Sequence, residues 1–576
     1  MKTMNTKRIK NILVSCLGVI TVGSALTSCN DFLDILPMND VVLEKYWTQK
    51  SDVTSVLMGC YESLESSDCL IRMGLWGEVR SDNIYTGSSV PWELEQVIKE
   101  NTLPTNSYCK WTAFYQTINR CNTICHYAPI VQQKDPNYTY SEMRSNVAEA
   151  TTIRSLCYFY LIRTFRDVPF TRQPSIDDTQ TFAVPATTFS DVLDSLIVDL
   201  EAVKDDAVKR YYADDNDLAY INTSRITRPA VYALLADLYL WKGEWDKCIA
   251  ACDYVLDFKQ QQFEEMKNRE GNISDMQLFN GYPLIMERPT GSTTSGHAYN
   301  EIFGTGNSFE SIFELYFRNN QSVTNSYISN YYIASNSGSI QNGRLAVNDE
   351  DGYFYGKMPE NRSELFSLSD CRAYESLMAL SSSSCALVKY ARQNVQFNTM
   401  GTISASTLRL SSSIRSTNYS NWIVYRMTDV MLMKAEAEIE KGSNYYPEAF
   451  SLINAVNKRA INALTPSVSD TLKYTDYSNT LQEMRDLLLT ERQREFLFEG
   501  KRWYDLVRMA LREGSTRNLA TIVVKKQKVN KDAIKIKLAD FNFLFFPYSR
   551  DELKVNPYLT QNPAYNTGDD SEMEKN

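Results

Sequence analysis

Apolar residues recur with a helical period over most of the chain, and residues 228–258 show this pattern most clearly. Their apolar and small positions match the offsets of one tetratricopeptide unit, at Tyr232, Leu235, Ala236, Tyr239, Gly243, Trp245, Cys248, Cys252 and Val255. Residues 431–456 repeat the pattern with two extra residues at the turn, and Thr151 to Phe165 supplies another such helix. Units of this kind bury their apolar faces only by stacking. The sequence therefore predicts a mainly α fold, a tetratricopeptide-like helical hairpin solenoid.

The limits of two helices are explicit near the C-terminus. Thr480 and Glu483 have the spacing of a capping box, which opens a helix that we expect to run to about Glu499. Gly500 then ends it. A second amphipathic helix is predicted by the apolar stripe that follows, at Trp503, Leu506, Val507 and Ala510.

Strand-like runs are short and few, the clearest being residues 312–317 and 543–547. The segments richest in Ser, Thr, Gly and Asn are 289–308, 335–342 and 401–420. No Pro-rich or highly charged linker separates domains, so these segments are interpreted as surface loops inserted in one body. We expect a loop-rich second layer with a few short strands and no large sheet.

Residues 1–28 have the pattern of a lipoprotein signal peptide. Four cations precede an uncharged apolar run from Ile12 to Leu26, which is too short to span a bilayer comfortably as a helix. The run ends in Leu26-Thr27-Ser28-Cys29, which looks like a bacterial lipobox, whose Cys is acylated and becomes the first mature residue. The alternative is an ordinary signal peptide with an incidental Cys.

Acylation would anchor the protein to a membrane, because several acyl chains together make the attachment effectively permanent. No later segment offers 18 uncharged apolar residues. Residues 29–576 would then form a single tethered body, with two family-like parts at about 29–230 and 231–576.

Removal of the signal takes away four cations and moves the net charge from −10 to −14, which argues against nucleic acid as a partner. Aromatic residues make up 12% of the chain and include 36 Tyr and 8 Trp. Such rings suit sugar stacking, but any single one is by default a core residue.

Ten of the 12 Cys lie between Cys60 and Cys385, and none forms a CxxC pair, so we interpret them as small buried thiols. With His126 and His297 as the whole complement of His, an imidazole-based metal site or a catalytic triad is disfavoured. No phosphate-binding, dinucleotide or hydrolase motif occurs, and we expect no cofactor. Calcium is conceivable at two acidic runs, Asp349-Glu350-Asp351 and Asp214-Asp215-x-Asp217, although solvated turns are the simpler interpretation.

Several motifs along the mature chain resemble those of the SusD/RagB family. The opening Cys29-x-Asp31-Phe32-Leu33-Asp34-x-x-Pro37 and the following Tyr46-Trp47 are similar to that family's N-terminus. Arg154 with Tyr158, and then Phe165-Arg166-Asp167-Val168-Pro169, match another segment, except that Arg166 stands where Gly is usual. Three C-terminal blocks complete the resemblance: Tyr425-Arg426-x-x-Asp429-Val430-x-Leu432-x-x-Ala435-Glu436-Ala437, Glu491-Arg492-x-x-Glu495-Phe496-x-x-Glu499-Gly500-x-Arg502-Trp503-x-Asp505-Leu506-x-Arg508, and Pro547 to Pro563.

The resemblance implies an α-helical, non-catalytic lipoprotein of the bacterial cell surface. Proteins of this family take part in polysaccharide utilisation, where they capture nutrient for a SusC-like, TonB-dependent outer-membrane transporter. The ligand is an oligosaccharide or, in RagB-like members, a peptide. Three function classes therefore stay open, namely a glycan-binding lipoprotein, which we favour, a peptide-binding one, and a surface-anchored hydrolase.

Glu491, Arg492, Glu495 and Arg502 form the densest charged cluster and could suggest a glycosidase. Two catalytic carboxyls must flank a substrate bond across a cleft, about 5 to 9 Å apart. Carboxylates interleaved with Arg on one helix more simply form an ion-pair network that fixes the hairpin. We favour this structural interpretation, and extend it to Arg154 and Asp429.

Binding without catalysis needs an exposed ring and a few polar groups, and residues 76–92 offer both. In SusD-like proteins the loop after a Ser-Asp element often carries a glycan-stacking aromatic, and Trp92 is the match. Tyr85, Asp82 and Asn83 are predicted to supply polar contacts. Weaker candidates lie in the loop-rich half, at Tyr299, Tyr327, Tyr331 and Tyr332.

The lipobox predicts that Cys29→Ala leaves the protein unlipidated, because the acylated thiol is lost. Metabolic labelling with a palmitate analogue measures this directly, with wild type as the reference. Equal labelling of wild type and variant would contradict the anchoring hypothesis.

Overall fold

The helical hairpins expected from the sequence are present in a computed structural model of the chain. It describes residues 46–176, 180, 183–214, 216–271, 273–317, 323–336, 339–341, 343–354, 365–367, 369–381, 383–398, 410–461 and 472–566. By its contacts the chain divides into a unit of residues 1–48 and a unit of residues 49–576. Cys29 and its lipobox lie outside the described residues. Apart from residues 46–48, the described residues all belong to the second unit.

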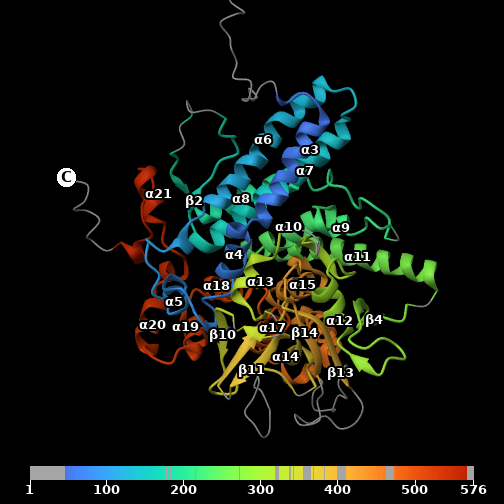
Figure 1. Ribbon diagram of the computed structural model, residues 1–576, viewed down its shortest axis with the longest axis vertical. Helices are drawn as coiled ribbons and strands as arrows, with labels where there is room; N and C mark the ends of the chain where they lie inside the picture. Colours follow the sequence, from blue (N-terminus) through green and yellow to red (C-terminus); the bar gives the residue numbers. More distant parts are fainter. Residues whose placement is uncertain are drawn as a thin grey trace, which may run out of the picture. The chain divides into compact units, whose positions relative to one another are not determined.

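The first helices of this second unit lie between residues 50 and 224. They are α3 (Lys50–Glu65), α4 (Ser67–Trp76), α5 (Trp92–Ile98), α6 (Thr112–Lys134), α7 (Tyr140–Phe165), α8 (Phe189–Glu201) and α9 (Ile221–Ser224). Figure 1 shows α3, α6 and α7 lying together, and each of these three contacts the other two. The helix predicted from Thr151 thus begins eleven residues earlier, at Tyr140, where Thr139 and Glu142 form a capping box.

The predicted hairpin at residues 228–258 is confirmed as α10 (Arg228–Lys242) and α11 (Trp245–Glu270). Gly243 joins them with φ 80°, a left-handed conformation that Gly adopts without the clash of a Cβ. The second predicted hairpin is α15 (Met427–Lys441) and α16 (Tyr446–Ile461). Contacts run in succession from α7 through α8, α10, α11 and α15 to α16. The mainly α class is confirmed, while superhelical stacking of a solenoid stays a prediction.

The remaining helices are short or lie near the C-terminus: α12 (His297–Tyr299), α13 (Ser326–Tyr331), α14 (Cys371–Ser376), α17 (Leu481–Glu495), α18 (Arg502–Glu513), α19 (Arg517–Val523), α20 (Lys531–Leu538) and α21 (Arg550–Val555). The capping box of Thr480 and Glu483 is confirmed at the start of α17. That helix ends at Glu495, four residues before the predicted limit, because Phe498 and Gly500 adopt positive φ in the turn to α18. Within the described residues, no helix combines the length and apolar character that crossing a bilayer requires.

Strands form only small sheets among the described residues. The largest has the order β1-β10-β12-β11, made of Tyr85–Thr86, Leu345–Asn348, Ser384–Leu387 and Leu377–Ser381. The others pair β14 (Leu410–Ile414), β13 (Arg392–Asn398) and β6 (Thr294–Ser295), β15 (Trp422–Arg426) and β7 (Ser311–Leu315), β2 (Val168–Pro169) and β3 (Ala186–Thr187), β4 (Met276–Phe279) and β5 (Tyr282–Ile285), and β8 (Ala334–Asn336) and β9 (Ser339–Gln341). The strand expected at residues 312–317 is therefore present as β7.

The prediction of a strand at residues 543–547 is wrong. Phe541–Leu544 is a 3-10 helix, and the chain after it runs buried through the interior. There the backbone N–H of Phe546 donates to the carbonyl of Thr164 at 2.8 Å. The apolar composition of this run reflects burial among helices instead of pairing in a sheet.

The Cys prediction is confirmed, because all ten described Cys are free thiols and only Cys125 is not fully buried.

Arg166, which stands where Gly is usual in the family motif, lies in the turn after α7. Its φ is 69°, so the left-handed conformation that Gly favours is kept. The Arg166 guanidinium donates to Asn542 Oδ1 at 2.8 Å, which ties this turn to the C-terminal segment.

A buried ion-pair network lies where α17 meets three other elements. The Glu495 carboxylate receives Arg426 from β15 at 2.6 Å, Arg372 from α14 at 3.0 Å, and Arg459 from α16. Arg426 also pairs with Glu499 at 2.8 Å. Burial acts to raise the pKa of Glu495, but the three guanidinium groups hold it well below its usual value.

The charged motif residues are thus structural, as predicted, but their position is not the predicted one. We expected ion pairs along one helix surface, whereas the partners are buried and come from distant segments. Arg492 reaches Asp429 on α15 at 3.1 Å, and Arg508 reaches Glu436 at 2.6 Å. Charged residues from three separate sequence blocks are therefore buried together in the interior. Each of these ions needs a partner of opposite charge, because water is excluded there.

Arg426→Met should lower the free energy of unfolding by about 3 to 5 kcal/mol, because it leaves Glu495 and Glu499 buried with too few partners. The matched control is Lys99→Met, which removes the cation of an exposed i, i+4 pair with Glu95 and should cost less than about 1 kcal/mol. Urea denaturation of the mature protein measures both. Equal midpoints for the two variants would contradict the role of the network.

Candidate ligand-binding surface

The loop predicted to present Trp92 is held at one end by sheet pairing. Tyr85 and Thr86 form β1, which pairs with Ala346 and Leu345 of β10. Beyond the strand, the N–H of Gly87 donates to the carbonyl of Arg344 at 2.9 Å. A Cβ on Gly87 would lie 2.4 Å from the Gly343 carbonyl oxygen, so the close approach of these two loops requires Gly.

Trp92 is the first residue of α5 and points away from the interior. Its side chain is 59% exposed, whereas Leu94, Val97 and Ile98 bury the opposite face of the same helix. Among the described aromatic residues, none packs its ring on Trp92. The ring therefore contributes little to the core, which leaves a large apolar face open to solvent.

The start of α5 is fixed by hydrogen bonds to the neighbouring segment. The Glu93 carboxylate accepts from the backbone N–H of Ser107 at 3.0 Å and from its hydroxyl at 2.5 Å. Asn106 donates to the Glu93 carbonyl at 2.8 Å. At the other end, Gln527 donates to the carbonyl of Ile98 at 2.9 Å. Because both ends of α5 are held, the scaffold fixes the position of the helix end that carries Trp92.

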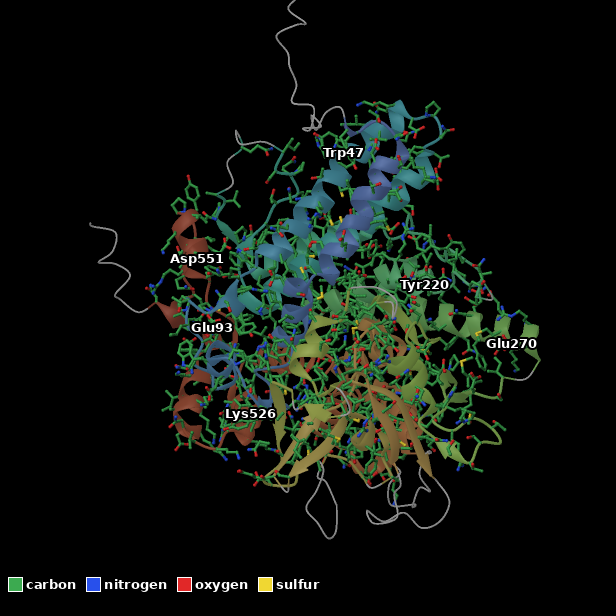
Figure 2. The ribbon with its side chains drawn as sticks, viewed as in Figure 1. Trp47, Glu93, Tyr220, Glu270, Lys526 and Asp551 are labelled. Carbon is green, nitrogen blue, oxygen red and sulfur yellow. The ribbon has the colours of Figure 1, made fainter. Side chains whose placement is uncertain are left out.

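Other polar and aromatic side chains extend this surface. The Tyr108 and Tyr331 hydroxyls lie 3.0 Å apart, and the Arg344 guanidinium lies 5.5 Å from the Tyr331 ring centroid. Lys528 Nζ lies 5.8 Å from the centroid of Tyr85. We call Tyr85, Trp92, Tyr108, Arg344 and Lys528 the Trp92 surface. Figure 2 labels Glu93, which follows Trp92, and Lys526, which precedes Gln527. The two labelled residues lie on the same side of this unit.

Sequence reasoning found two of these five residues and missed three. Trp92 stood out because it joins no apolar stripe, and Tyr85 because it follows the Ser-Asp element. The three residues that were missed are Tyr108, Arg344 and Lys528, which lie on distant segments of the chain. Lys528, for example, follows Tyr85 by 443 positions. No local pattern marks them, because only the pairing of β1 with β10 and the contact of Gln527 with α5 bring them together.

A cavity of about 280 Å³ opens beside the Trp92 surface. It is lined by Asp82, Asn348, Glu350, Asp351, Tyr353, Phe354, Lys525 and Lys526. Asn348 belongs to β10, and Glu350 pairs with Lys528. A larger groove of about 520 Å³ lies elsewhere, between α6, the segment after β2 and α21. We assign the smaller cavity to the candidate site because its wall residue Glu350 pairs with Lys528 of the Trp92 surface, so it adjoins the exposed rings.

Asp82 and Asn83 do not offer the free contacts that we predicted. Asp82 is 7% exposed, and its two oxygens accept from Arg502 at 2.9 and 3.0 Å. Burial acts to raise the pKa of Asp82, but Arg502 holds it below the usual value. Asn83 donates to Glu78 and accepts from Gln493, each at 2.7 Å. Asn83 therefore positions the segment from inside, and Asp82 does so while it also lines the wall of the cavity assigned to the candidate site.

The four Tyr candidates of the loop-rich half are also corrected, because their side chains are buried. Tyr299 is 1% exposed and its hydroxyl faces the carbonyl of Arg392 at 3.3 Å. Tyr327 is fully buried, with its ring centroid 5.3 Å from that of Trp422. Tyr331 and Tyr332 pack beside it. Rings within a Ser- and Asn-rich sequence here fill the interior.

The acidic runs considered for calcium are already engaged. Asp349 is buried and accepts from the backbone N–H of Phe354 at 2.7 Å, while Glu350 pairs with Lys528. Asp214 accepts from Gln262 at 3.0 Å, and Asp215 lies outside the described residues. Calcium needs several oxygens directed at one point, which the described part of either run does not provide.

Comparison with known proteins places the chain. A family model described as the SusD family matches residues 385–565, and another, described as starch-binding associating with outer membrane, matches residues 31–240. The SusD-like protein P38 of Formosa agariphila is 25% identical over 517 residues, which cover 87% of this chain and 92% of the relative.

Solved structures share the fold. A SusD superfamily protein from Bacteroides thetaiotaomicron has a TM-score of 0.62 at 17% identity, over 90% of this chain and 99% of its own. A laminarin-binding SusD-like protein has a TM-score of 0.58 at 19% identity, over 90% and 100%. Together with the motifs and the mainly helical architecture, these matches show that the chain belongs to the SusD/RagB family.

Proposed function

We propose that the protein is a lipid-anchored cell-surface lipoprotein that binds an oligosaccharide through the Trp92 surface and delivers it to a SusC-like, TonB-dependent outer-membrane transporter. The observation that carries the proposal is the exposure of Trp92 on a rigidly held helix end. An exposed indole offers a flat apolar face to the C–H face of a sugar ring, and binding surfaces are enriched in such anchors.

The surroundings of Trp92 supply what sugar hydroxyls need. Tyr85 and Tyr108 are half-buried, so each presents part of its ring or hydroxyl at the surface. Arg344 and Lys528 add donors, and the neighbouring cavity of about 280 Å³ has Asn348 and Asp351 in its wall. Few polar groups around an aromatic platform suit a ligand that is bound and released unchanged.

Three further observations support binding in place of catalysis. The carboxylates of the Glu491 motif, which suggested a glycosidase, are buried and paired with Arg, so they cannot flank a substrate. Among the proteins with this fold is one whose name states that it binds laminarin, a glycan. Residues 31–240 match a family described as starch-binding and associating with the outer membrane.

Trp92→Ala should weaken glycan binding by about 1 to 3 kcal/mol, because the stacking face is lost, which is roughly a tenfold to hundredfold rise in Kd. The fold should stay intact, since the ring is mostly exposed. Calorimetric titration against a panel of glycans and peptides measures binding, and thermal melting measures stability.

Tyr140→Ala is the matched control for Trp92→Ala. Tyr140 is also the first residue of a helix and is 65% exposed, but it lies at the start of α7. Its variant should bind as wild type does. Unchanged glycan affinity in Trp92→Ala would contradict the binding role, and tight binding of peptides alone would favour the RagB-like alternative.

Delivery to a transporter predicts a stable partner. Purification of the native protein from outer membranes in mild detergent should recover a large β-barrel protein with it. The Cys29→Ala variant serves as a control, because a protein without its anchor should be depleted from the membrane fraction. Recovery of the lipidated protein as a free monomer in several detergents would count against the transporter.

A further inference from the structure

Three potential metal ligands meet in the interior, away from the Trp92 surface. Cys371 and Glu375 are four residues apart on α14, so their side chains share one face of the helix. Glu287 comes from the segment after β5. One ligand atom from each of the three lies within 4.8 Å of the other two, and each residue is at most 5% exposed.

The two carboxyl groups lie within hydrogen-bonding reach of each other. Glu287 and Glu375 hydrogen-bond to one another through their side chains, while Glu287 Oε2 and Glu375 Oε1 are buried and have no other described donor. Two buried carboxyl groups at this distance need a positive charge between them, because both only accept when they are ionised. That charge is a shared proton or a cation.

The charge of this cluster is not balanced by the buried ion-pair network beside it. Arg459, which acts on both carboxyl groups, already pairs with Glu310 at 3.0 Å and with Glu495. Arg372, the neighbour of Cys371, pairs with Asp370, Glu491 and Glu495. Burial therefore raises the pKa of Glu287 to about 7, and burial and Glu287 raise that of Glu375 further.

We propose that Glu287, Cys371 and Glu375 bind a divalent metal ion of the zinc class, which ties the segment after β5 to α14. A thiolate with two carboxylates suits a borderline ion such as Zn²⁺, whereas Ca²⁺ and Mg²⁺ take oxygen ligands alone. Two positive charges would match the two carboxylates. Loss of the two carboxyl protons and the thiol proton to water leaves three negative charges, of which the ion offsets two, and the remaining one faces the Arg459 guanidinium.

The geometry requires only small adjustments. Tetrahedral ligands at zinc bond lengths of about 2.0 to 2.3 Å lie roughly 3.3 to 3.8 Å apart. The present separations of up to 4.8 Å close to these values through side-chain rotation of the two Glu residues. The three ligands are buried and fill three of the four positions that zinc prefers, so a water molecule would take the fourth.

The test uses the full mature protein, stripped of metal with a chelator and then given zinc or cobalt. We expect stoichiometric zinc by elemental analysis and a rise in melting temperature on adding zinc. Cobalt should give a thiolate charge-transfer absorption. Cys371→Ser should remove this absorption and weaken zinc binding by at least roughly tenfold. The matched control is Cys385→Ser, which alters a buried thiol on β12 and should leave both signals unchanged.

Glu375→Gln keeps the test independent of folding defects. It keeps the size of the side chain, so the metal-free variant should stay folded, as thermal melting would show. It should also lose the gain on adding zinc. The proposal is overturned if zinc is absent and has no effect on wild type, or if the cobalt absorption persists in Cys371→Ser. The first outcome would leave the two carboxyl groups sharing a proton, and the second would place the metal-binding thiolate at another Cys.

Discussion

The carboxylate of Glu495 is the point on which this unit depends. It receives guanidinium groups from α14, β15 and α16, so one buried charge joins three elements that lie far apart in the sequence. A buried ion is tolerated only when its partners are in place, because water cannot replace them. The arrangement therefore permits few alternatives. Helix packing alone, which tolerates sliding and rotation, would specify the relative positions of these elements less strictly.

The same motif positions the candidate binding surface. Beyond Glu495, the turn at Gly500 lies very close to Gly77. A Cβ on Gly77 would lie 1.7 Å from the carbonyl oxygen of Gly500. Glu78 accepts from the N–H of Gly500, and Arg502 holds Asp82. These contacts fix the segment that leads into β1 and then into the loop before Trp92. Residues that we first expected to touch the ligand thus act one layer deeper, by holding the residues that can.

The buried ion-pair network also shows which buried acidic residues have no cation of their own. Most acidic groups around α17 have an Arg or Lys partner, but Glu287 and Glu375 lie at the edge of the network without one of their own. The proposed metal would complete the balance there. It would act on the loop-rich half of the unit, whereas glycan binding is proposed for Trp92, so the two hypotheses depend on separate residues.

The sequence by itself determined the local features. Helical periods, the Gly243 turn and the Thr480 capping box were predicted because each depends on residues within one or two helical turns. Trp92 was also predicted, since a ring that joins no apolar stripe has no local reason to be buried. The family motifs were readable for the same reason, as they are short and contiguous.

Only the tertiary structure decided burial and partnership. Tyr299 and Tyr327 lie in polar sequence and are nevertheless buried, and the run at 543–547 is apolar without being a strand. The charges of the Glu491 motif could not be assigned to the interior, because their partners are tens to hundreds of residues away. Whether a polar side chain is exposed depends on the surface that covers it. That surface comes from distant segments, so no local pattern encodes it.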